Sequence, residues 1–207
     1  MRTRCCVGID MSVRSPGLSV YCECTAAPTL HLYFLCMRKR DRGRNHVSMI
    51  QLPHRVLCSI GHLPYVPVPS EAKGGIVHTT RLCQSIREVL TQGCTGARTI
   101  YIEDYAYGMH DSRATSSLCE LGGVLKYVLQ DMGPVVLVAP SRLKKIFTGD
   151  GRATKQDMYR AFRARGYPDL YRVFGMGDTA TGVPAPISDL VDATALIADA
   201  ITNKIIS

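Results

Sequence analysis

The sequence predicts an α/β fold in which a mixed β-sheet carries helices on both faces. Three strand-like segments follow one another near the N-terminus, and helical and strand-like segments alternate from residue 76 onward. Strands joined by short turns pair antiparallel, whereas strands separated by a helix usually pair in parallel. The composition, 46% hydrophobic and 20% charged, is typical of a globular domain. We therefore expect one domain over residues 1–207, with a basic, proline-rich insertion at about 38–75.

The first three strands are predicted from short apolar runs rich in β-forming residues and separated by breakers. The runs are CCVGIDMS (5–12), LSVYCECT (18–25) and LHLYFLCM (30–37). Their short connections predict an antiparallel meander. The insertion that follows is harder to assign, because four prolines between residues 53 and 69 favour irregular structure or edge pieces.

The second half predicts two more strands and four helical segments, which gives a five-stranded sheet. Strands are expected at 97–106 and 134–140, and helices at 76–90, 116–132, about 154–165 and from about 188. The turn TGDG (148–151) could cradle a phosphate through its backbone N–H groups or form a plain left-handed turn, and the sequence does not separate the two. Because no G-K-[ST] follows it, we expect no nucleotide cofactor.

The charge balance favours a polyanionic partner. The net charge is +8 and the pI is about 9.1, which makes nucleic acid the first candidate. A cluster of cations that includes Arg38, Lys39 and Arg40 either contacts phosphates or forms a solvated loop.

The nine cysteines include no CxxC pair, and most lie in apolar, strand-like segments. Buried free thiols in a reducing compartment are the favoured interpretation, and a zinc site on Cys22, Cys24 and His31 is a weak alternative. No apolar run is long enough to span a membrane, and the first strand leaves no room for a signal peptide. We expect an intracellular protein of the cytoplasm, or of the nucleus or a viral replication site if the host is eukaryotic.

Four carboxylates stand out against this background. Asp10 and Glu103 each lie in an apolar strand, on the face opposite Val7 and Ile9 in the first strand and opposite Ile100 and Ile102 in the other. Asp189 and Asp192 are three residues apart in SDLVDATALIADA and so share one face of a helix.

Each acid alone has an ordinary explanation. A strand-end carboxylate can face water, and an acidic pair in a first turn can cap a helix or interact with its dipole. Together they favour a metal site, because four converging carboxylates would repel one another without cations. Oxygen ligands suit Mg²⁺ or Mn²⁺, and two such ions are used in phosphodiester hydrolysis.

The motifs resemble those of the RuvC-type Holliday junction resolvases of the RNase H-like superfamily. The similar segments are GIDMSVRSPGLSVY, IYIEDYAYG, ELGGVLKYVLQDMG, VAPSRLKKIFTGDGRATKQDM and SDLVDATALIADA. The likeness covers most of the chain, and the SPGLSV segment is similar to that of phage and large-DNA-virus members. The ordered G-x-G-x-A-x-K and D-x-x-D-A runs are the most specific part.

The resemblance implies an RNase H-like fold, a homodimer and Mg²⁺-dependent cleavage of four-way DNA junctions by paired nicks. It implies that Asp10, Glu103, Asp189 and Asp192 hold two ions, with Mn²⁺ as a substitute for Mg²⁺. Lys155 and Lys144 match basic residues near the scissile phosphate, with Lys155 in a catalytic role and Lys145 as an additional cation.

Three alternatives remain open from the sequence. The enzyme could cut flaps or forks more broadly, or the fold could bind junctions without cutting them. A ribonuclease acting on RNA–DNA hybrids is disfavoured by the two specific runs. The aromatic residue that would wedge into a junction is not identifiable, with Tyr105 and Tyr107 as positional candidates only.

Overall fold

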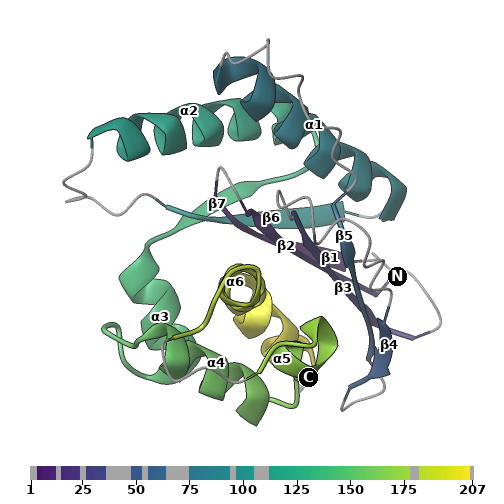
Figure 1. The fold of residues 1–207 in the computed structure, drawn as a ribbon. Helices are drawn as coiled ribbons and strands as arrows, with labels where there is room; N and C mark the ends of the chain where they lie inside the picture. The colour runs from purple at the N-terminus through teal and green to yellow at the C-terminus, as the bar shows by residue number, and fades with distance from the viewer. Residues whose placement is uncertain are drawn as a thin grey trace.

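A seven-stranded mixed sheet with helices on both faces forms the protein (Figure 1). The computed structural model describes residues 4–12, 15–23, 27–35, 48–52, 56–63, 75–93, 97–104, 112–177 and 182–205. The strands are β1 (Arg4–Asp10), β2 (Gly17–Cys22), β3 (Thr29–Phe34), β4 (Ser48–Gln51), β5 (Leu57–His62), β6 (Ala97–Glu103) and β7 (Val135–Val138). Their order across the sheet is β4-β5-β3-β2-β1-β6-β7.

The centre of the sheet has the predicted topology. β1 pairs antiparallel with β2, and β2 pairs antiparallel with β3. On its other side β1 pairs in parallel with β6, which pairs in parallel with β7. The predicted mixed sheet is therefore confirmed, and it places the C-terminal ends of β1 and β6 side by side.

The predicted strand count of five is wrong, because β4 and β5 extend the sheet from within residues 38–75. β5 pairs in parallel with β3, and β4 forms the edge. Both strands are short, and β5 pairs with β3, which is distant in sequence, while β4 pairs with β5, so local periodicity could not reveal them. The single-domain boundary stays a prediction.

Six helices lie among the described residues: α1 (Gly75–Gly93), α2 (Ser112–Leu129), α3 (Pro140–Thr148), α4 (Lys155–Ala164), α5 (Leu170–Phe174) and α6 (Ile187–Ile205). α1 and α2 cover one face of the sheet, and α3 to α6 lie on the other (Figure 1). α3 and α5 were not predicted, because nine and five residues are too few for a helical periodicity to show clearly.

Each face has its own hydrophobic core, which follows from strand alternation. Val7, Ile9, Ile100 and Ile102 pack with α1 and α2. The core on the opposite face contains buried residues of α3 to α6 together with Tyr21. The predicted facing of the apolar residues in β1 and β6 is confirmed, and it leaves Asp10 and Glu103 on the face that α6 covers.

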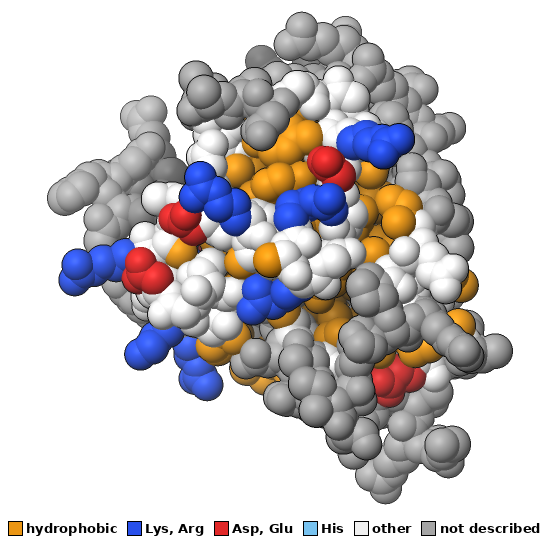
Figure 2. All heavy atoms as spheres, turned by 90° about the horizontal axis from the view of Figure 1, so that it is seen from below, with side chains coloured by type: hydrophobic (Ala, Val, Ile, Leu, Met, Phe, Trp, Pro, Cys, Tyr) orange, Lys and Arg blue, Asp and Glu red, His pale blue; other side chains and the backbone are white. Residues whose placement is uncertain are grey.

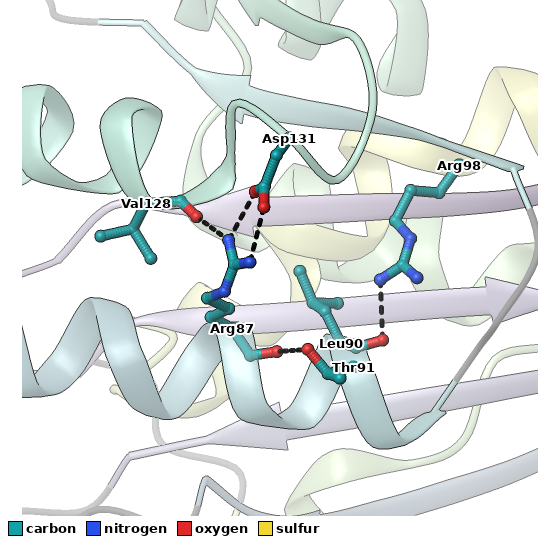
Figure 3. A network of polar contacts seen from close by, with 6 residues as sticks. All are labelled: Arg87, Leu90, Thr91, Arg98, Val128 and Asp131. Atoms are coloured by element: carbon teal, nitrogen blue, oxygen red, sulfur yellow. Dashed lines mark hydrogen bonds and ion pairs between the residues drawn. The ribbon is translucent and has the colours of Figure 1, made fainter.

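Arginine side chains tie the ends of α1 to neighbouring elements (Figure 3). Arg87 forms a bidentate pair with Asp131, at 2.6 and 2.7 Å, and also donates to Val128 O at the end of α2. Arg98 Nη1 in β6 donates to Leu90 O at 2.7 Å. These contacts fix α1 and α2 on the face away from the carboxylates.

The cysteine prediction is correct for some of the described residues and wrong for others, since Cys119 is exposed. Burial raises the pKa of the Cys58 and Cys83 thiols to about 12. Cys5 is disulfide-bonded, which residue counting could not show, because an odd total says nothing about individual pairs. Cys24 of the alternative zinc set lies outside the described residues. None of the described helices has the length and apolar character needed to cross a membrane.

Candidate active site

Two strand ends bring Asp10 and Glu103 together. β1 and β6 run in parallel with Ile9 opposite Ile102, so the next residues, Asp10 and Glu103, are neighbours at the same edge of the sheet. Asp10 is only 9% exposed. A hydrogen bond joins the two carboxyl groups.

α6 packs closely against the sheet because the strand residues that face its backbone are glycines, which have no side chain. A Cβ on Gly8 would lie 2.1 Å from Ala193 O, and one on Gly17 would lie 2.1 Å from Asp189 O. Gly17 is also the β2 partner of Asp10. Ser19 Oγ donates to Ala193 O at 2.6 Å, which fixes the same helix on β2. The first turns of α6 therefore lie directly over the end of β1.

Burial and like charge perturb the strand carboxyls. Burial raises the pKa of Asp10 well above its ordinary value, and the charges of the other three acids, Glu103 first, raise it further. Burial also raises the pKa of Glu103, and this rise is partly offset by the hydrogen bond from Asp10 and by the charges of Lys144 and Lys155. Mutual effects of this kind require the carboxylates to be close together.

The helix carboxylates belong to the same group. Burial raises the pKa of Asp192 to about 7, with further contributions from the charges of Glu103 and Asp189. Asp189 is 7% exposed, its Oδ1 accepts a hydrogen bond from Ser188 Oγ at 3.0 Å, and its Oδ2 is buried with no hydrogen-bond partner. α6 begins at Ile187, before Asp189, so Asp189 is not the N-cap that the sequence allowed.

Two lysines lie at the edge of this acidic group. Lys155 is the first residue of α4, where Thr154 and Asp157 form a capping box that fixes the start of the helix. Its Nζ donates to Ser188 Oγ at 3.2 Å. Lys144 of α3 is near enough to lower the pKa of both Glu103 and Asp192. The structure therefore brings both lysines to the carboxylates.

The donor set suits a hard divalent cation. All four side chains offer carboxylate oxygens, the ligands that Mg²⁺ and Mn²⁺ prefer, and a buried carboxylate oxygen without a partner is costly unless a cation compensates it. As the side chains lie, no three acidic, cysteine or histidine residues in the described part of the chain are grouped closely enough to hold an ion. Side-chain rotation would be needed to bring three of these carboxylates onto one ion.

Other predicted residues are placed differently. Lys145 is exposed on α3. Arg38, Lys39, Arg40, Tyr105 and Tyr107 lie outside the described residues.

The TGDG segment contains a left-handed turn at Gly149. Gly149 has φ 90° and donates its N–H to Lys145 O. The N–H groups of Asp150 and Arg152 bond to the Thr148 hydroxyl and the Asp150 carboxylate. Amides that are occupied within the turn are not available to a phosphate.

Sequence analysis missed three residues that shape the site, namely Gly8, Gly17 and Ser188. The motifs contain all of them, but nothing in a strand pattern distinguishes a glycine that admits a helix from one that marks a bulge.

The comparisons with known proteins bear on the fold. No protein-family model matches the sequence, and no curated protein matches it. Among solved structures, Thermus thermophilus RuvC superposes with a TM-score of 0.54 at 15% identity, covering 97% of both chains. The same protein in complex with a Holliday junction substrate gives 0.55 at 14% identity, covering 99% of this chain and 98% of that one.

A third solved structure, the yeast mitochondrial Holliday junction resolvase Ydc2, gives a TM-score of 0.53 at 9% identity. The alignment covers 92% of this chain and 75% of the Ydc2 chain. This chain has the RuvC-type fold. In that fold the sheet end that carries Asp10 and Glu103 faces the first turns of α6. No comparison bears on a phage or viral branch.

The face of the RuvC-type fold that carries α3 to α6 is rich in cations (Figure 2). Residues 140–172 contain nine lysines and arginines against three aspartates, a surplus of six within a chain whose net charge is +8. Arg142, Lys145 and Arg152 are exposed there, on the same side of the sheet as the candidate site.

Proposed function

We propose that the protein is a metal-dependent endonuclease that cuts branched DNA, with the four-way junction as its first substrate. The observation that carries the proposal is the convergence of four acidic side chains from β1, β6 and α6 at one end of the sheet. Carboxylates placed where each raises the pKa of another are expensive to maintain. A site that binds divalent cations gives this arrangement a function.

Asp10, Glu103, Asp189 and Asp192 would hold two Mg²⁺ ions, or Mn²⁺ in their place. When bound, such ions activate water and stabilise the charge on the attacking and leaving oxygens of a phosphodiester. The chain itself supplies the positions: β1 and β6 fix two carboxylates on a rigid sheet, and α6 presents the other two.

The two lysines would act on the DNA and not on the ions. Lys155 projects from the capped start of α4 and Lys144 from α3, and both reach the edge of the acidic group. A cation at this place offsets phosphate charge as it develops during cleavage. Lys155 is the stronger candidate for this catalytic role, because the hydroxyl of Ser188 links its Nζ to the Asp189 carboxylate.

The choice of substrate rests on the fold and the charge. One solved neighbour, Ydc2, is named as a Holliday junction resolvase, and another, RuvC, is in complex with a Holliday junction substrate. The cationic face around α3 and α4 suits the phosphates of DNA arms, which supply affinity without sequence choice. Paired nicks and a homodimer are further parts of the proposal, and analytical ultracentrifugation with and without a junction tests the dimer.

The deciding experiment compares wild type with Asp192→Asn on a labelled synthetic four-way junction in Mg²⁺. We expect paired nicks near the branch point with wild type and at least a 100-fold slower rate with the variant, because a metal ligand is lost. Junction binding should persist in both proteins. Binding without cutting by wild type in both Mg²⁺ and Mn²⁺ would instead favour a non-cleaving module.

Matched flap, fork and linear duplex substrates separate the second candidate function. Equal cleavage of flaps and junctions would make the protein a broader branched-DNA nuclease. Equal cleavage of linear duplex would contradict the proposed selectivity for branches.

A further inference from the structure

A buried hydroxyl lies between the lysine and the carboxylates of the candidate site. Ser188 is 3% exposed. Its Oγ accepts a hydrogen bond from Lys155 Nζ at 3.2 Å and donates one to Asp189 Oδ1 at 3.0 Å. A hydroxyl has one proton to donate and can also accept. The directions of the two bonds are therefore fixed by the chemistry of their partners.

The hydroxyl keeps opposite charges apart. Among the described residues the ion pairs are Arg87–Asp131 and Arg160–Asp157, so Lys155 and Asp189 do not pair directly. A direct pair would place an ammonium group on the carboxylate, where it would compete with a divalent ion. Through the serine, Asp189 receives a neutral donor on Oδ1, while its Oδ2 stays buried without a hydrogen-bond partner.

The backbone holds this hydroxyl in place. The Ser188 N–H donates to Pro184 O at 3.0 Å, and the carbonyl of Asp189 packs against the α-carbon of Gly17. Other buried hydroxyls on this face serve the fold alone. Thr194 Oγ1 donates to Leu190 O within α6, and Ser19 Oγ donates to Ala193 O. Within the described residues, the side-chain hydrogen bonds that link a lysine to an acid of the site pass through Ser188.

We infer that Ser188 is a positioning residue of the candidate site. It fixes the orientation of the Asp189 carboxylate so that Oδ2 remains available to a divalent cation, and it holds the Lys155 ammonium group at the edge of the site. The inference rests on the proposed function, because it assigns Asp189 to the binding of an ion. It predicts that losing the hydroxyl weakens metal binding before any DNA is present.

The test measures Mn²⁺ binding to the metal-free protein by electron paramagnetic resonance, without DNA. The variants are Ser188→Ala, Ser188→Thr, which keeps the hydroxyl, and Ser85→Ala as a matched control. Ser85 is a buried serine of α1 whose hydroxyl donates to Arg81 O, on the opposite face of the sheet. Changes that disturb the orientation of a metal ligand typically cost 10- to 100-fold in affinity. We expect the Mn²⁺ dissociation constant to rise by at least about 10-fold in Ser188→Ala only.

Each outcome separates this inference from the proposed function. Wild-type Mn²⁺ affinity in Ser188→Ala overturns the positioning role and leaves the nuclease proposal standing. Absence of Mn²⁺ binding by wild type overturns both. If wild type binds Mn²⁺ but cuts no branched DNA, the proposed function fails, and the comparison of affinities still decides the role of Ser188. If Ser188→Ala lacks a cooperative thermal transition, Ser188→Gly replaces it, and wild-type affinity in that variant overturns the inference.

Discussion

At the candidate site, burial and neighbouring acids make the ionised form of individual carboxyl groups unfavourable. Asp192 has a pKa of about 7 because it is buried near other acids, whereas an aspartate in an unfolded chain has a value near 3.8. Above pH 7 the folded protein must keep this group ionised close to like charges. Two lysines relieve only part of the cost.

This predicts a stability cost that depends on pH. The native state holds the Asp192 proton up to about pH 7, while the unfolded state releases it near pH 4, so the unfolding free energy falls as pH rises through that window. In EDTA at pH 8, Asp192→Asn should therefore unfold at a higher temperature than wild type. The gain is of the order of a few kcal/mol, since one pKa unit corresponds to about 1.4 kcal/mol.

Thermal unfolding followed by circular dichroism at pH 8 and pH 4 checks this prediction. The difference between variant and wild type should be small at pH 4, where Asp192 is protonated in the folded state and nearly half protonated in the unfolded state. Glu88→Gln, an exposed change on α1, serves as control. Equal unfolding temperatures for Asp192→Asn and wild type at pH 8 would show that burial does not perturb this group.

At the scale of elements, the position of α6 depends on two residues without side chains. Gly8 and Gly17 allow the helix backbone to touch β1 and β2, and this close approach delivers Asp189 to the end of β1. Gly123 is different, because a Cβ there would meet nothing within 4 Å, in the exposed part of α2. The same substitution should thus have opposite effects at Gly17 and Gly123.

Gly17→Ala should lower the unfolding free energy and abolish junction cleavage, because the new Cβ would sit 2.1 Å from Asp189 O and push α6 away. Gly123→Ala should raise the unfolding free energy by about 0.5–1 kcal/mol through helix propensity, with cleavage unchanged. Urea denaturation and the junction cleavage assay measure both. Wild-type activity in Gly17→Ala would show that the helix does not need this close contact.

At the scale of the whole molecule, the two faces of the sheet have different tasks. α1 and α2 complete an apolar core and are held by the Arg87 and Arg98 contacts (Figure 3). α3 to α6 carry the candidate site and the surplus of cations (Figure 2). We expect the second face to supply the electrostatic part of DNA binding.

Salt titration of junction binding tests this division. Each phosphate contact contributes about 0.9 to the slope of log affinity against log salt on duplex DNA. Combined substitution of Arg142, Lys145 and Arg152 by glutamine should lower that slope by about 2 to 3 and weaken binding at low salt. Arg81→Gln, an exposed change on α1, should leave it unchanged. An unchanged slope in the triple variant would place the DNA elsewhere.

The sequence was enough to predict which residues lie at the site. It was not enough to predict how their side chains are arranged. The motif resemblance named the four acids and two lysines that the structure brings together, while their roles stay predictions. The orphaned Asp189 Oδ2 and the link through Ser188 could not be predicted, because both depend on how α4 and α6 meet.

The sequence by itself determined the types of the main elements and the facing of their residues. Alternation in β1 and β6 is a property of consecutive residues, so it placed Val7 and Ile9 on one side and Asp10 on the other. Only the tertiary structure decided that β5 joins β3, that α6 touches Gly17, and that a serine separates Lys155 from Asp189. Such contacts join residues far apart in the chain, and they form because burying two apolar cores selects one packing of the whole.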